Sequence, residues 1–168
     1  MKIILRLQSA MLKEINYYET TVKERSHFID WERVHMVSCA TIGYHLAVQR
    51  GVDPILAAAA CTCHDYGRII TGKQTNHAYN GYQPVQSFLR KTKLFNEEQI
   101  ELIATAVKNH SKKEEVGSPL EEVVKDADVL DFYQYGYKFA TEAQKKRVES
   151  LLGHPVDVEI VESSRLPK

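Results

Sequence analysis

The chain has 168 residues, 43% of them hydrophobic and 26% charged, a composition typical of one folded globular domain and not of a disordered chain. Its 22 Lys and Arg residues balance its 22 Asp and Glu residues. The chain therefore lacks the basic excess that is typical of a dedicated nucleic-acid-binding protein. No stretch reaches the ~20 apolar residues of a membrane span, and the start lacks a signal-peptide pattern. We therefore expect no membrane association and a cytoplasmic protein with reduced cysteines.

The first half of the chain predicts three helices. Apolar residues recur every three or four positions near the start, which indicates an amphipathic N-terminal helix within residues 1–25. Asp30 is a candidate cap for a second helix, from Trp31 to about Gln49, which Gly51 ends. Asp53 and the proline after it begin a third helix, apolar nearly all round, as expected of a buried central helix. It is predicted to run to residues 64 and 65, and residues 67–74, with two glycines, predict a loop.

The second half predicts four more helices, each opened by a capping residue. They cover about residues 76–91, 96–110, 118–135 and 141–153. Only residues 156–161 alternate as a strand does, and such a short segment cannot make a sheet alone. The predicted fold is all-α, a single-domain bundle of about six to seven helices.

A histidine and an aspartate stand side by side at the end of the predicted central helix. Burying both is costly unless each is paired or bound to a metal ion. Ligands that project inward from facing helices are the usual way to build a metal site in a bundle. The candidate ligands in chain order are His35, His64, Asp65, His77, His110 and Asp128. Mixed imidazole and carboxylate ligands suit a divalent Fe, Mn, Zn, Ni or Co ion, and no thiolate is required.

The order His…His-Asp…Asp resembles the signature of the HD-domain superfamily of metal-dependent phosphohydrolases. The resemblance extends to the apolar helix before His64-Asp65 and to Arg68 after it. It also includes the segments 76–81, 107–111 and 125–131, which are similar to elements of a subgroup with two additional histidines. The similar part covers about residues 30–136 of one domain spanning 1–168, with the N-terminal helix and residues 137–168 as flanks.

This resemblance implies a ligand assignment. His35, His64, Asp65 and Asp128 would hold a first ion, and His77 and His110 a second ion bridged through Asp65. Asp128 is chosen over Asp126 because it stands in the Ala-Asp-x-Leu-Asp context of the family ligand. The resemblance leaves open whether one or two ions bind.

The implied function is hydrolysis of a phosphate ester, a nucleotide or a small phosphomonoester, by a metal-activated water. Asp65 would orient the water, and Arg68, together with Lys73, Lys112 or Lys113, would neutralise phosphate charge. Two alternatives stay open: an HD-type diiron oxygenase with the same six ligands, and a non-catalytic module that binds a nucleotide or a partner protein. The other three histidines, His27, His45 and His154, match no family element and are expected to be structural or exposed.

Overall fold

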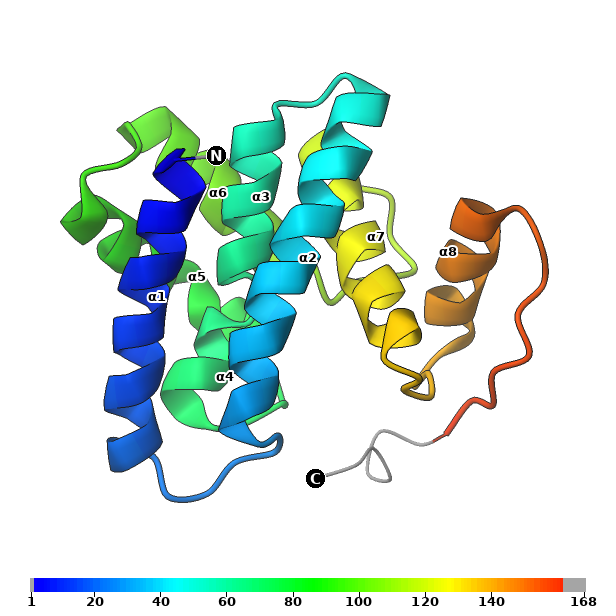
Figure 1. Ribbon diagram of the computed structural model, residues 1–168, viewed down its shortest axis with the longest axis horizontal. Coiled ribbons are helices and arrows are strands. Elements are labelled where there is room, and N and C mark those ends of the chain that lie inside the picture. Colours follow the sequence, from blue (N-terminus) through cyan, green and yellow to red (C-terminus); the bar gives the residue numbers. More distant parts are fainter. Residues whose placement is uncertain (1, 162–168) are drawn as a thin grey trace.

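The structure, a computed structural model, describes residues 2–161. Seven helices of ten or more residues and one of six make up this part of the chain (Figure 1). They are α1 (Lys2–Thr21), α2 (Ile29–Arg50), α3 (Pro54–Cys63), α4 (Tyr66–Thr71), α5 (His77–Thr92), α6 (Glu97–Asn109), α7 (Pro119–Gln134) and α8 (Glu142–Leu152). The all-α prediction is confirmed, and none of the described helices is long and apolar enough to cross a membrane.

The helix starts follow the predicted caps except at α2 and α5, where Asn76 precedes the helix but makes no side-chain capping hydrogen bond. Asp53 caps α3, and Asn96, Ser118 and Thr141 each close a capping box at the start of α6, α7 and α8. The predicted cap Asp30 is wrong, because α2 begins one residue earlier, at Ile29, after an uncapped Phe28. The carboxylate of Asp30 instead pairs with Arg33 at 2.7 Å.

The predicted loop at residues 67–74 is partly wrong, because residues 66–71 form α4. Gly67 lies inside this helix and not in a turn. A Cβ atom there would lie 2.0 Å from the carbonyl oxygen of His77, so the glycine permits close packing of α4 on α5. Gly72, with φ of +74°, ends α4 in a left-handed conformation, as glycine commonly does.

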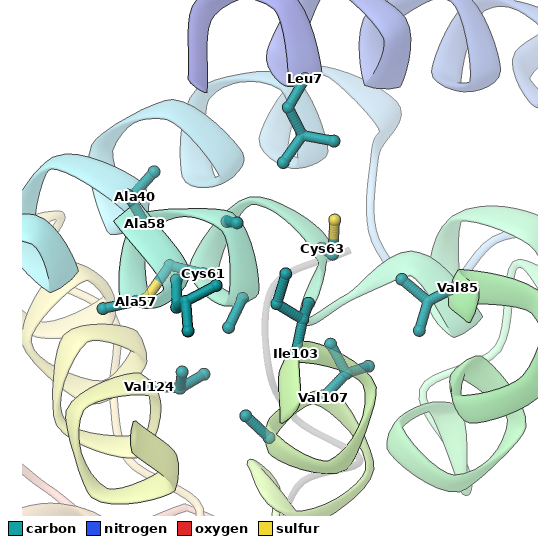
Figure 2. Packing of buried hydrophobic residues seen from close by; sticks show 14 of the residues in the cluster. Leu7, Ala40, Ala57, Ala58, Cys61, Cys63, Val85, Ile103, Val107 and Val124 are labelled. Atoms are coloured by element: carbon teal, nitrogen blue, oxygen red, sulfur yellow. The ribbon is translucent and has the colours of Figure 1, made fainter. Parts of the chain in front are cut away.

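The core is built around α3, as its uninterrupted apolar sequence predicts. Residues 57–61 of α3 and Cys63 are fully buried. Their small side chains let α1, α2, α6 and α7 pack against α3 from several sides. Figure 2 shows Leu7 of α1 and Val124 of α7 on different sides of this helix, with Ile103 of α6 close by.

The C-terminal part forms a second, smaller apolar cluster that holds α8 beside α7 (Figure 1). Phe139 and Val148 are fully buried there, and Val156 of the tail packs with them. The strand-like residues 156–161 form only an isolated bridge, between Ile160 and Phe139. The start of α8 is thereby fixed close to the end of the core that carries the candidate ligands.

Candidate metal centre

Four of the six candidate ligands meet at one point inside the bundle. The Nε2 atoms of His35, on α2, and His64, directly after α3, lie 2.9 Å apart. Asp128 of α7 places Oδ1 3.2 Å from Nε2 of His35, and Asp65 places Oδ2 3.1 Å from Nε2 of His64. The two remaining imidazole–carboxylate distances in this group are 3.5 and 3.6 Å.

The other two candidate ligands meet at the opposite oxygen of Asp65. His77, at the start of α5, and His110, directly after α6, bring their Nε2 atoms within 3.0 Å. Oδ1 of Asp65 lies 3.2 Å from the first of these nitrogens and 3.7 Å from the second. Asp65 therefore presents one oxygen to each group of imidazoles, as a carboxylate that bridges two ions does.

The far ring nitrogen of each histidine has a fixed partner. Nδ1 of His64, His77 and His110 lies 2.7 Å from the carbonyl oxygen of the residue three positions earlier. Because a carbonyl can only accept, these Nδ1 atoms carry the proton. Nδ1 of His35 instead contacts Oδ2 of Asp131, a fully buried carboxylate. The Nε2 atoms thus face each other in two pairs, His35 with His64 and His77 with His110.

This arrangement fits bound cations. Two neutral imidazoles with bare Nε2 atoms about 3 Å apart repel each other, whereas a cation between them turns both lone pairs into ligands. Ligand atoms that share one ion at about 2.0–2.2 Å lie roughly 3–3.5 Å from one another. The distances in both groups, 2.9–3.7 Å, have this size. A backbone carbonyl or carboxylate behind each ligating imidazole is also the usual outer contact of a metal site.

Comparison with known proteins agrees with this geometry. The sequence pattern of the HD domain matches residues 33–133, more than half of the chain. The chain belongs to the HD-domain family. A crystal structure of a predicted HD superfamily hydrolase from an uncultured Thermotogales bacterium shares the fold, with a TM-score of 0.55 and 19% identity over 90% of this chain and 84% of the other. No curated protein matches the chain significantly.

Within this HD domain, the two neighbouring aspartates of α7 point to different places. Asp128 faces the imidazoles, whereas Asp126 binds Arg50 at 2.8 Å and Arg147 at 2.7 Å. The geometry therefore favours Asp128 over Asp126 as the ligand of this pair.

Two buried cations neutralise the carboxylates of the centre. Burial alone would raise the pKa of Asp65, but Arg68 and the neighbouring imidazoles hold it well below its usual range. The pKa of Asp128 is likewise held well below its usual range despite burial, by Lys113, whose Nζ contacts Oδ2. Both aspartates are thus kept ionised, the form that binds a metal.

A cavity of about 210 Å³ adjoins the centre, and only some of the residues predicted to contact the substrate line it. Arg68 and Lys113 line it, although both cations already contact carboxylates of the centre. Lys73 and Lys112 do not line it, and Lys112 pairs with Glu115 at 3.1 Å on the surface. Other parts of the wall are Gln74, Ser111, Phe132, Thr141 and Gln144.

Sequence patterns missed two further groups at the centre. His27, expected to be structural or exposed, is buried and lines the cavity, and burial and the charge of Arg68 lower its pKa to about 4. Cys39, one turn after His35, has its thiol within 4.8 Å of ligand nitrogens of His35 and His64. Burial and the adjacent Cys61 raise the pKa of Cys39 well above its usual value, so this thiol stays protonated.

Proposed function

We propose that this HD domain is a metal-dependent hydrolase of phosphate esters, acting on a nucleotide or a small phosphomonoester. The observation that carries the proposal is the six-ligand cluster, in which Asp65 faces both groups of imidazoles. A divalent ion bound there would lower the pKa of a coordinated water toward ~7 and polarise a phosphoryl oxygen. The name of the similar Thermotogales protein, a predicted HD superfamily hydrolase, points the same way.

The protein's own groups would hold and orient the reactants. His35, His64, Asp65 and Asp128 would hold the first ion, and His77 and His110 the second. The fixed Nδ1 contacts keep the imidazoles in one tautomer and one orientation. Arg68 and Lys113 keep the carboxylates ionised and add positive charge to the cavity wall, which favours an anionic substrate.

The test is hydrolysis by protein loaded with Mn²⁺ or Co²⁺. A panel of phosphomonoesters and nucleotides should show turnover that chelation abolishes. Asp128→Asn should lose both metal and activity, whereas Asp126→Asn, on the same helix, should keep its metal. Absence of turnover on every phosphate ester with every ion, in a folded protein that binds metal, would contradict the proposal.

The chain also carries its own optical probe of ion binding. Its one tryptophan, Trp31, stacks on the ring of His35 with a centroid distance of 4.7 Å and an angle of 17°. Paramagnetic ions such as Co²⁺ should quench the fluorescence of Trp31 on binding. In Asp128→Asn this quenching should be lost.

A diiron oxygenase is the second candidate. One observation favours it: both buried cations of the cavity are paired with carboxylates, which offsets the positive charge available to a phosphate group. The iron content and the visible absorption of the purified protein distinguish the two functions. An oxygenase should purify with about two irons per chain and visible absorption, and should show no phosphate release with Mn²⁺ or Co²⁺.

A further inference from the structure

His27 is a buried side chain without a structural explanation. Its exposed fraction is 6%, yet within residues 2–161 no hydrogen bond reaches either ring nitrogen. An imidazole has at least one N–H in every protonation state. Within residues 2–161 the fully enclosed polar side-chain atom without a partner is Nε1 of Trp31, so the unpaired ring nitrogens of His27 are open to the cavity. His27 lines the same cavity as His35, Asp65 and His77, so a ligand in that cavity can complete its hydrogen bonding.

The loop that carries His27 is held rigidly against the loop before α5. Arg25 donates to the carbonyl oxygens of Tyr18 and Ile69 at 2.7 and 3.1 Å. The backbone N–H of Ser26 donates to the carbonyl of Gly72 at 2.7 Å. The Oγ of Ser26 accepts from the backbone of Gln74 at 3.0 Å. His27 is therefore positioned before any ligand binds, as a recognition group should be.

The loop before α5 connects this wall to the centre itself. Gln74 accepts from Nδ1 of His77 through its carbonyl and from Nη1 of Arg68, at 2.8 Å, through its side chain. Arg68 also donates to Glu32 and Asp65, so four of its five N–H groups are engaged. On this side of the cavity, His27 is a group whose ring nitrogens make no hydrogen bond within the described residues.

We propose that His27 is a substrate-binding residue that donates a hydrogen bond to a phosphoryl oxygen not coordinated by metal. The proposal rests on the phosphohydrolase function proposed above. It assigns to a neutral donor of the α1–α2 loop a role that the sequence suggested for Lys73, Lys112 and Lys113. Removal of His27 should weaken binding of the phosphoryl group while the metal centre stays intact.

The experiment measures binding of inorganic phosphate to Mn²⁺-loaded protein by calorimetry. His27→Phe keeps a ring of similar size and removes the N–H, whereas His27→Gln keeps a donor. The Phe variant should bind phosphate about 10-fold more weakly or worse, and the Gln variant within about threefold of the wild type. His45→Ala, an exposed histidine of α2 away from the cavity, is the matched control and should bind as the wild type does.

Steady-state kinetics and metal analysis complete the test. With p-nitrophenyl phosphate, His27→Phe should raise KM more than it lowers kcat, at unchanged metal content. Wild-type phosphate affinity in His27→Phe, or loss of metal from that variant, would overturn this inference alone. A wild-type protein that binds metal but neither binds phosphate nor hydrolyses the ester would instead overturn the proposed function.

Discussion

At the scale of single residues, the four candidate ligand imidazoles make different contacts behind the centre. Three of them donate from Nδ1 to a backbone carbonyl, a neutral acceptor. His35 alone contacts a carboxylate, that of Asp131, which also accepts from Oγ of Ser38. A carboxylate behind an imidazole makes it a stronger metal ligand and fixes its tautomer.

Asp131→Asn should therefore weaken the first ion site. The substitution is isosteric but removes the charge, and such outer contacts typically change metal affinity about 10- to 100-fold. A chelator competition titration measures this change, with Asp157→Asn on the exposed tail as the control. Equal metal affinity in Asp131→Asn and the wild type would show that the carboxylate charge contributes nothing to His35.

The candidate ligands could be predicted from the sequence because their order, and the helix ends beside them, form a recognisable pattern. Side chains outside that pattern could not. Lys112 and Lys113 are neighbours of the same type, yet one is exposed and the other buried against Asp128. His27 lies in a loop whose position depends on contacts with residues more than 40 positions away, and no local signal predicts such contacts.

At the scale of elements, the crossing of α4 and α5 sets the position of the second group of ligands. Gly67 and Gly81 face each other there, and a Cβ atom on Gly67 would also lie 2.7 Å from the backbone nitrogen of Gly81. Backbone atoms cannot yield as a flexible side chain does. Any side chain at position 67 must therefore push α5, and His77 with it, away from α4.

Gly67→Ala should reduce metal content from two ions per chain toward one. We also expect a loss of about 1–3 kcal/mol in the free energy of unfolding, as is usual for overpacking. Elemental analysis and denaturant unfolding measure the two effects. Gly136→Ala, where a Cβ atom meets nothing within 4 Å, should lose some stability through its positive φ but keep all its metal. Full metal content in Gly67→Ala would contradict this account.

The start of α7 is joined to α8 and to the preceding loop by a buried ionic network. Partial burial alone would raise the pKa of Glu122. Lys125, the N–H of Gly117 and Arg147 stabilise the carboxylate more strongly, so the pKa is lowered to about 2. A carboxylate with a lowered pKa in the folded state stabilises the protein above its unfolded pKa, near 4.5. This contribution is lost as the pH falls from about 4.5 to about 2.

Unfolding measured against pH tests this network. The wild type should lose stability over this acidic range more steeply than Glu122→Gln, since the amide does not titrate. Above pH 5 the variant should be the less stable of the two. Parallel stability curves for the two proteins across this range would show that Glu122 does not contribute.

Most helix ends of this fold could be predicted, because capping boxes and left-handed glycines act locally. Ser118 and Thr141 close their boxes as their sequences predict. α4 could not be predicted, since the reason for Gly67 is a contact with a different helix. A glycine that is needed for contact between two helices is predicted as a turn when only the neighbouring sequence is considered.

At the scale of the whole molecule, the candidate ligands come from five places along the chain. They stand on α2, after α3, at the start of α5, after α6 and on α7. Ions bound at their centre would therefore cross-link most of the bundle. Without ions, this cross-link would be lost.

Metal removal should consequently lower the thermal stability of the domain. Ions at 1,000 times their dissociation constant add about 4 kcal/mol, which for a chain of this size corresponds to roughly 10 °C in Tm. Thermal unfolding with and without a chelator measures the shift. Asp128→Asn should show a much smaller shift, and an identical shift in that variant would exclude Asp128 as a ligand.

The cavity wall combines two kinds of chain segment. The part matched by the HD pattern, residues 33–133, contains all six candidate ligands, whereas His27 precedes it and Thr141 and Gln144 follow it. Part of the cavity wall would then come from stretches of the polypeptide that supply no candidate ligand. Chimeras that keep the middle of the chain and exchange its two ends with another family member would offer a route to change ligand preference while the candidate metal centre is kept.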